Sequence, residues 1–67
     1  MKTVANFITD SGEKIAIRRD PNGKVWNYYN IGTSPCEAGP FSELYFAYKA
    51  LKKHRPTARL LYGQHTW

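Results

Sequence analysis

Few side chains in this 67-residue chain could carry out covalent or metal chemistry. Cys36 is the only cysteine, and His54 and His65 are the only histidines. Nucleophilic catalysis would need the Cys36 thiol beside a histidine base, and nothing in the sequence brings either histidine near it. One Cys and two His, without CxxC or HxxxH spacing, cannot supply the four ligands of a structural zinc site. We therefore expect an incidental free thiol, no metal and no cofactor.

The five acidic residues do not form a catalytic pattern either. Asp10 and Asp20 stand where chain turns are expected, and Asp is favoured there because its side chain bonds to nearby backbone amides. Glu13, Glu37 and Glu43 are scattered without a regular spacing. Neither a GxGxxG nor a GxxxxGKS/T stretch occurs, so a nucleotide-phosphate loop is not expected. The sequence predicts a protein that is not an enzyme and that acts by binding.

The balance of charge and the aromatic content indicate what kind of partner it binds. Ten Lys and Arg against five Asp and Glu give a formal charge of +5 and a pI near 9.6. Such a balance favours polyanionic partners, namely nucleic acid, a nucleoprotein or an acidic protein surface. Aromatic residues make up 15% of the chain, and Trp, Tyr and Arg are the residue types that dominate binding surfaces.

The length of the chain leaves room for one domain, residues 1–67. Folding at this size removes only about 60% of the unfolded chain's surface from water, so the core is small and either a monomer or a homodimer is expected. A lone cysteine excludes an intrachain disulfide and suggests a reducing cytoplasm. Residues 1–7 lack the apolar run of a signal peptide, and no 18 consecutive residues are apolar. We expect a cytoplasmic protein with no membrane partner.

The first half of the chain has the pattern of a three-stranded antiparallel meander. Residues 10–12 (Asp-Ser-Gly) and 21–23 (Pro-Asn-Gly) are each typical of a type I turn followed by a glycine in the left-handed conformation, the usual three-residue hairpin. Residues 2–9, 14–20 and 24–31 flank these turns and are rich in β-branched and aromatic residues. The stretch 32–40, with two prolines and two glycines, is expected to be irregular.

The second half returns to helical spacing. Ser42 is placed to cap a helix, with Phe41 and Phe46 at the two positions of a hydrophobic staple, and Pro56 ends it. One face of this helix is apolar: Leu44, Ala47, Tyr48 and Leu51. Residues 57–62 predict a fourth strand, closed by a glycine, with 64–67 as a tail. The expected fold is α+β, a meander packed on one helix and followed by a fourth strand, in the order β-β-β-α-β.

The two turns also fix which side chains share a face of the sheet. Three-residue turns place Phe7 opposite Ile15 and Ile15 opposite Tyr29. The face for the helix then collects Thr3, Ala5, Phe7, Ile15, Ile17, Val25, Tyr29 and Ile31. The opposite face collects Val4, Asn6, Ile8, Lys14, Ala16, Arg18, Trp26, Tyr28 and Asn30. A two-residue turn at 22–23 would instead send Trp26 and Tyr28 into the core.

The face away from the helix is the expected binding surface. Arg18 stands opposite Trp26 there, and an apolar patch rimmed by cations is typical of an interaction site, although an ordinary solvated sheet surface is the alternative. The helix offers a second basic surface, for which simple solvation is also the alternative. Phe46 is either held by the staple or exposed as an anchor. The candidate binding residues are Lys14, Arg18, Arg19, Trp26, Tyr28, Lys49, Lys52 and Lys53.

Two functions remain open. Residues 17–26 followed by a helix are similar in layout to plant AP2-type domains and to the amino-terminal arm-binding domains of some integrases. That resemblance implies nucleic-acid binding through the sheet, DNA rather than RNA, with Lys14, Arg18 and Arg19 on phosphates or base edges and Trp26 and Tyr28 stacking. In size and composition the chain also resembles small accessory proteins of phages and mobile elements. That resemblance implies an inhibitor that blocks a host machine, such as a CRISPR effector or an RNA polymerase, by protein–protein contact.

Overall fold

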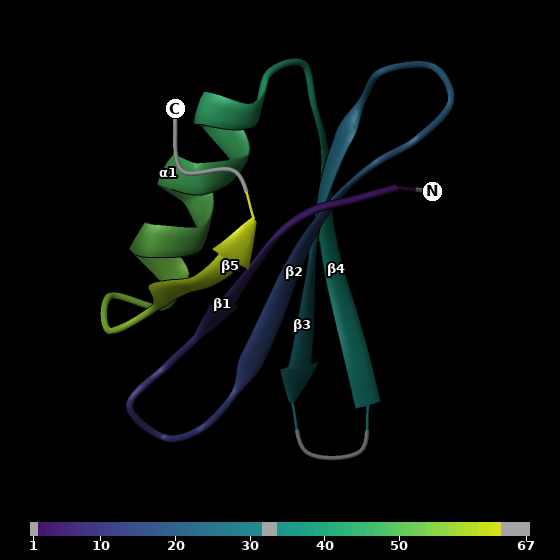
Figure 1. The fold of residues 1–67 in the computed structure, drawn as a ribbon. Coiled ribbons are helices and arrows are strands. Elements are labelled where there is room, and N and C mark those ends of the chain that lie inside the picture. Colours follow the sequence, from purple (N-terminus) through teal and green to yellow (C-terminus); the bar gives the residue numbers. More distant parts are fainter. Residues whose placement is uncertain (1, 32–33, 64–67) are drawn as a thin grey trace.

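The computed structural model describes residues 2–31 and 34–63, with the backbone alone at residues 30, 31, 34 and 35. The predicted tail and the tip of the 32–40 stretch lie outside the described residues. The chain forms one antiparallel sheet of five strands and one helix, in the spatial order β4-β3-β2-β1-β5 (Figure 1). The elements are β1 Lys2–Ile8, β2 Lys14–Arg19, β3 Val25–Ile31, β4 Ser34–Phe41, α1 Leu44–His54 and β5 Arg59–Gly63.

Both predicted hairpins are confirmed. In the first, the Gly12 amide donates to the Thr9 carbonyl and the Thr9 amide to the Glu13 carbonyl, both at 3.0 Å, which closes a three-residue loop. The second repeats this arrangement between Asp20 and Lys24, whose backbone groups bond at 2.9 Å. Glycines 12 and 23 have φ of 87° and 88°, as the left-handed third position requires.

The predicted register is confirmed over most of the meander. Phe7 pairs with Ile15, Ile15 with Tyr29, and Arg18 with Trp26. The alternative two-residue turn is therefore wrong, because it would have moved β3 by one place and put Trp26 on the helix side. Side chains of Ala5, Phe7, Ile15, Ile17, Val25 and Tyr29 are buried beneath the helix, as expected.

The start of β1 departs from the predicted faces. The pairing with β2 shifts between Thr3 and Ala5, so that Thr3 stands opposite Arg18 rather than in the core. Val4 is the extra residue of this β-bulge, and its half-buried side chain packs against the core cluster instead of lying on the far face. The expected positions of Thr3 and Val4 were wrong because a bulge inserts one residue and reverses the alternation before it.

The prediction of an irregular stretch at 32–40 was also wrong for its described part. Ser34–Phe41 forms β4, which pairs with β3 and makes the sheet five-stranded instead of four-stranded. Proline lacks an amide donor and is tolerated only on a strand with one free edge, and β4 lies at the edge of the sheet. A second register shift, opposite Trp26, accommodates Gly39 and the cis peptide to Pro40.

The N-cap of α1 lies one residue later than predicted. Glu43 occupies the cap position, with extended φ and ψ of −139° and 153°, and no side-chain oxygen caps the first turn. The prediction of Ser42 as cap was therefore wrong, and with it the staple, because the staple positions move to residues 42 and 47. Phe41 packs against the core, whereas Phe46 is 48% exposed. The basic last turn and the end of the helix before Pro56 are as predicted.

The helix packs on one face of the sheet through the predicted apolar stripe. Leu44, Ala47 and Leu51 are buried, and the Tyr48 ring lies 6.0 Å from the Phe7 ring. Asn27 of β3 is fully buried at this interface, where its amide nitrogen donates to the Ala47 carbonyl at 2.8 Å. This hydrogen bond joins the middle of the helix to the sheet.

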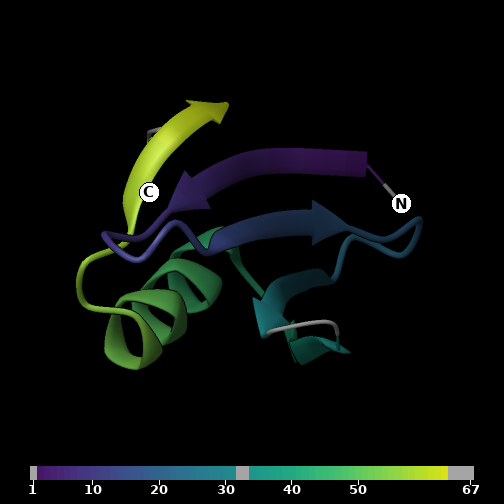
Figure 2. The same ribbon diagram turned by 90° about the horizontal axis from the view of Figure 1, so that it is seen from below.

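The last strand pairs with the first. β5 runs antiparallel to β1, with Leu60 opposite Phe7 and Tyr62 opposite Asn6. Figure 2 shows the sheet curling, with α1 on its hollow side and no described helix or strand on the other. Within the described residues, the one helix has 11 residues and falls short of the length and apolar character needed to span a membrane.

Candidate functional site

The face of the sheet that α1 does not cover is here called the open face (Figure 2). The strand pairing places side chains of all five strands on it. Its members follow from the alternation of side chains along each strand and from the cross-strand pairs. They are Thr3, Asn6 and Ile8 of β1, Lys14, Ala16 and Arg18 of β2, Trp26 and Tyr28 of β3, Glu37 of β4, and Arg59 and Tyr62 of β5. Lys14, Arg18, Trp26 and Tyr28 were predicted here, and the structure places these four on this face.

The centre of the open face is a stack of Arg18 on Tyr28. The guanidinium carbon of Arg18 lies 5.0 Å from the centre of the Tyr28 ring, within the range of a cation–π contact. Desolvation, followed by the charge of Glu37 and a hydrogen bond with it, raises the pKa of the Tyr28 hydroxyl, which stays neutral near pH 7. Glu37 therefore holds the far end of the ring while the ring supports the Arg18 guanidinium.

Trp26 lies beside this stack and is fixed from two sides. Its indole nitrogen donates to the Asp20 carboxylate at 3.3 Å. On the β4 side it lies against Gly39, where an added Cβ would stand 3.1 Å from indole Cε3. The ring is therefore half-buried and held in place on the open face.

The carboxylates of the described residues are mostly engaged with neighbouring groups. Asp10 pairs with Arg59 at 3.2 Å, and Glu13 accepts two hydrogen bonds from Arg55. For Asp20, desolvation alone would raise the pKa, but hydrogen bonds from Trp26, Lys24 and Asn22 outweigh it and lower the pKa. Arg18 and Lys14 form no ion pair within residues 2–31 and 34–63, so their charges are available to a ligand.

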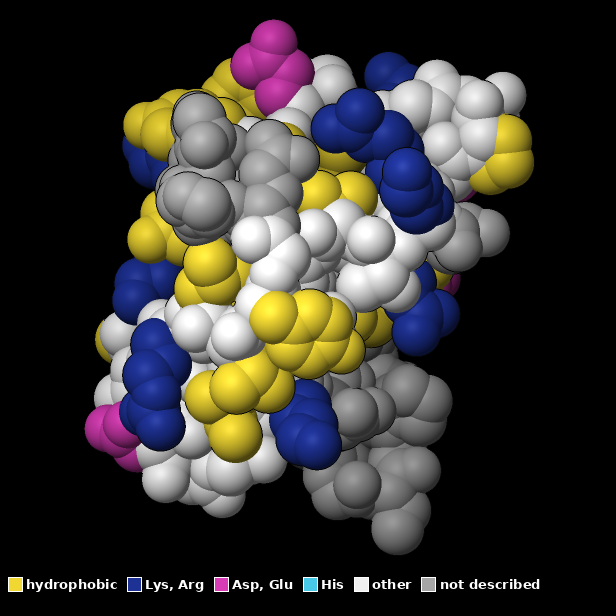
Figure 3. All heavy atoms as spheres, viewed as in Figure 1, with side chains coloured by type: hydrophobic (Ala, Val, Ile, Leu, Met, Phe, Trp, Pro, Cys, Tyr) yellow, Lys and Arg dark blue, Asp and Glu magenta, His cyan; other side chains and the backbone are white. Residues whose placement is uncertain are grey.

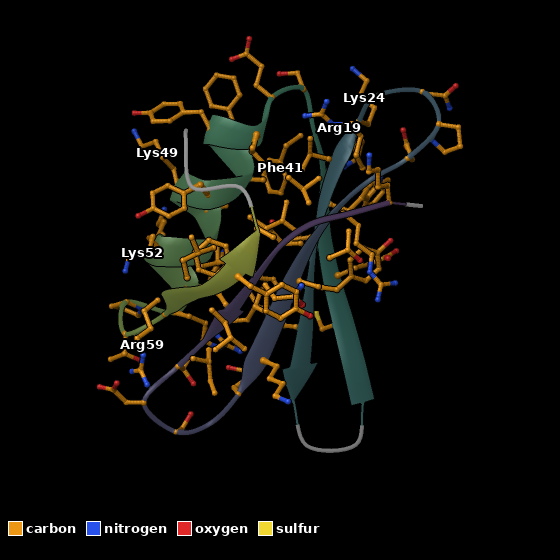
Figure 4. All side chains as sticks on the ribbon, in the orientation of Figure 1. Arg19, Lys24, Phe41, Lys49, Lys52 and Arg59 are labelled. Carbon is orange, nitrogen blue, oxygen red and sulfur yellow. The ribbon has the colours of Figure 1, made fainter. Side chains whose placement is uncertain are left out.

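Arg19 does not share the open face with Arg18. It follows Arg18 directly in β2, so its side chain projects to the other side of the sheet, beyond the end of the core. There it lies at the same end of the sheet as Lys24 (Figure 4), and it pairs across the ladder with Lys2. Lys and Arg side chains gather at this end of the molecule, at the upper right of Figure 3.

The lysines of α1 form a separate surface. Figure 4 places Lys49 and Lys52 across the molecule from Arg19. The ammonium of Lys49 lies 5.4 Å from the centre of the Tyr45 ring. Lys52 donates to the carbonyls of Pro56 and Ala58, at 3.2 and 2.7 Å, so it stabilises the turn after the helix. Lys53 is exposed. Of the three α1 lysines predicted to bind a partner, Lys52 therefore makes hydrogen bonds within the protein.

The most exposed large apolar side chains of the described residues lie on α1 and β5. Tyr45 and Phe46 project from the first turn of the helix, and Leu61 and Tyr62 from the last strand. Phe46 was expected to be either stapled or exposed, and it is exposed, with its ring 5.8 Å from that of Tyr45. Apolar side chains on the left of Figure 3 alternate with Lys and Arg along this side.

The free thiol of Cys36 has neighbours that the sequence did not indicate. Cys36 and His54 line one hollow, together with Tyr29, Ala38 and Arg55. β4 supplies the cysteine and the end of α1 supplies the histidine and arginine, so an unpredicted strand brings them together. Arg55 is engaged by Glu13 and lies 5.3 Å from the Tyr29 ring. A thiol–histidine hydrogen bond is not among the contacts of the described residues.

No protein-family model, no curated protein and no solved structure matches this chain. Its function is therefore inferred from its own residues. Lys2, Lys24, Glu37 and Tyr62 were missed as site residues. Two of them depend on features with no sequence signal: Lys2 on the bulge in β1, and Glu37 on the pairing of the proline-containing β4.

Proposed function

We propose that this protein is a non-enzymatic nucleic-acid-binding module that docks on DNA through the open face. The observation that carries the proposal is the Arg18–Tyr28 stack, in which a cation without an ion-pair partner in the described residues lies over an aromatic ring that Glu37 holds in place. Guanidinium planes and aromatic rings are the groups on which bases stack, and arginine also reads base edges and phosphates. The cytoplasm is the proposed place of action.

The surroundings of the stack support this proposal. Lys14 lies on the same strand and the same face as Arg18. Trp26 stands opposite Arg18 and is held by its hydrogen bond to Asp20. Because α1 lies on the other side of the sheet, a ligand can approach this face. A cation whose position is already set by its neighbours loses less side-chain freedom when a ligand binds. Glu37 adds one negative charge to the face, but that charge is directed at the Tyr28 hydroxyl.

The first prediction concerns Arg18 itself. Arg18→Gln removes the charged guanidinium and keeps a polar side chain at this position. We expect it to weaken binding to a short DNA duplex about tenfold or more, which corresponds to a loss of about 1–3 kcal/mol of binding free energy. The measurement is fluorescence anisotropy with a labelled duplex at low salt. Lys53→Gln on α1 is the matched control, because it changes net charge equally at an exposed site away from the open face.

The comparison between the two variants decides whether the open face is the interface. A loss confined to Arg18→Gln, with circular dichroism unchanged, supports it. An equal loss in both variants would mean that net charge alone governs binding. Undiminished binding in Arg18→Gln would contradict the assignment.

A second candidate function is blockade of a host protein, and the exposed aromatic residues at the start of α1 favour it. Tyr45 and Phe46 are 45% and 48% exposed, and their ring centroids lie 5.8 Å apart. Large aromatic side chains exposed together are typical of protein interfaces. A pull-down from host lysate with and without nuclease separates the two functions, because a protein partner of this surface would be retained after nuclease treatment.

A further inference from the structure

The start of β1 brings two like charges directly opposite each other. Lys2 pairs with Arg19 across the β1–β2 ladder. Continuing the regular pairing of Ala5 with Ile17 would have set Lys2 opposite Asp20, a favourable arrangement. The bulge at Val4 shifts the register by one residue and replaces an opposite charge with a like one. Like charges directly across a ladder are destabilising, and β-bulges are frequent at functional sites.

Two adjoining hollows surround this pair of cations. Lys2, Thr3, Val4 and Arg19 line a hollow of about 230 Å³ that has no acidic residue in its wall. Lys2 and Arg19 also line a second hollow with Asp20 and Pro21. The first hollow thus combines the ammonium-bearing Lys2 with the guanidinium-bearing Arg19, the charged donors that suit a phosphate group.

The nearby carboxylate does not neutralise these cations by direct pairing. Both oxygens of Asp20 are occupied, since Oδ1 accepts from the amides of Asn22 and Lys24 at 2.9 Å and Oδ2 accepts from the Trp26 indole. Within the described part of the chain, neither Lys2 nor Arg19 forms a salt bridge. Lys24 at the same end adds a further positive charge (Figure 4).

We propose that the hollow formed by Lys2, Thr3, Val4 and Arg19, here called the bulge site, binds a phosphate group. The like-charged pair would then be stabilised by the ligand that it holds. The bulge site lies off the open face because Arg19 projects to the other side of β2 from Arg18. It therefore does not require the proposed function, although a phosphate at the end of a nucleic acid is one source of its ligand and free phosphate is another.

Inorganic phosphate tests the site directly. In ¹H–¹⁵N correlation spectra at constant ionic strength, we expect phosphate to shift the amides of residues 2–4 and 19 saturably, while equivalent chloride does not. Arg19→Gln should weaken this binding at least tenfold, and Lys53→Gln should leave it unchanged. Absent or non-saturating shifts, or equal binding by Arg19→Gln, would overturn the proposal.

Thermal unfolding gives a second readout that a purely structural role would not produce. Without phosphate, Arg19→Gln should raise Tm by about 1–5 °C, because it removes the repulsion from Lys2. Phosphate should raise the Tm of the natural protein and not that of the variant, since only a ligand of the folded state stabilises it. A Tm lowered by Arg19→Gln, together with an unchanged response to phosphate, would contradict the site. Lys2→Gln serves as the second variant.

Oligonucleotides with and without a terminal 5′-phosphate distinguish the source of the ligand. A preference for the phosphorylated form that disappears in Arg19→Gln identifies a nucleic-acid end. Saturable binding of inorganic phosphate without any affinity for DNA would keep the bulge site and remove the proposed function. Strong DNA binding without a response to inorganic phosphate would remove the bulge site and keep the proposed function.

Discussion

Two glycines, one in the β1–β2 turn and one at the end of β5, show how local surroundings decide which residue a position requires. Gly12 and Gly63 both have positive φ, of 87° and 111°. A Cβ on Gly12 would meet nothing within 4 Å, whereas one on Gly63 would lie 2.6 Å from the Val4 carbonyl oxygen and the Ala5 Cα. Gly63 therefore allows β5 to approach the bulged part of β1, and Gly12 only completes a turn.

The two glycines give a prediction at the residue scale. Gly63→Ala should destabilise the fold by about 3 kcal/mol, because strained φ is combined with a clash against backbone that cannot move without breaking the β1–β5 pairing. Gly12→Ala should lower the free energy of unfolding by about 1 kcal/mol, because only the positive φ is unfavourable for alanine there. Urea unfolding of both variants measures the difference, and hydrogen exchange should show β5 amides losing protection in Gly63→Ala only. Equal destabilisation by the two would contradict this assignment.

The sequence predicted the positions of some single residues in the sheet well and those of others poorly. The hairpin glycines fixed the register of Phe7, Ile15, Tyr29 and Trp26, because a three-residue turn leaves one pairing. Thr3 could not be placed, since the bulge at Val4 follows from no turn residue. The neighbours of Trp26, which hold its ring, depend on side-chain packing across strands and have no counterpart in a local pattern.

At the scale of elements, the helix and the sheet are joined by a buried polar contact. Asn27 of β3 donates from Nδ2 to the Ala47 carbonyl of α1, at 2.8 Å, and to the Tyr29 hydroxyl, at 3.2 Å. Its Oδ1 is buried without a hydrogen-bond partner among the described residues. The contact fixes the position of α1 on the sheet, while the buried Oδ1 without a partner lowers the net contribution of Asn27 to stability.

Substitution of Asn27 tests this contact. Asn27→Asp should destabilise the fold by about 3 kcal/mol or more at pH 7, because a buried carboxylate would face the Ala47 carbonyl. Burial raises a carboxyl pKa, so this loss should be largest above the raised pKa and shrink as pH falls toward the unfolded value. Asn27→Val, the uncharged control, should cost less at pH 7 and show no such pH dependence. A pH-independent loss in Asn27→Asp would refute a buried carboxylate.

The elements with strong local sequence signals were predicted correctly, whereas β4, which lacks such signals, was not predicted. The meander, the apolar helix face and the last strand each have a clear period or a stop residue. β4 has neither, because Pro35, Gly39 and Pro40 interrupt its pattern and its pairing with β3 is stabilised by tertiary context. The helix cap moved by one residue for a similar reason, since Glu43 takes the extended conformation that Ser42 was expected to adopt.

At the scale of the whole molecule, the arrangement of charge matters more than its total. Acidic residues at the β1–β2 turn pair with Arg59 and, through Glu13, with Arg55. The cations of β2 have no such partners in the described part of the chain. Lys14, Arg18 and Arg19 of β2 are therefore cations without an ion-pair partner among the described residues, and Lys14 and Arg18 lie on the open face.

The central claim is that these cations on the open face meet the phosphates of DNA, and its most direct test is the salt dependence of binding. Affinity for a duplex, measured between about 50 and 200 mM salt, should fall linearly on a log–log plot with a slope of about −2, as expected for two phosphates neutralised by Lys14 and Arg18. Arg18→Gln should reduce the slope by about 1, and Lys53→Gln should leave it unchanged. A slope near zero, or one that Arg18→Gln does not alter, would contradict the claim.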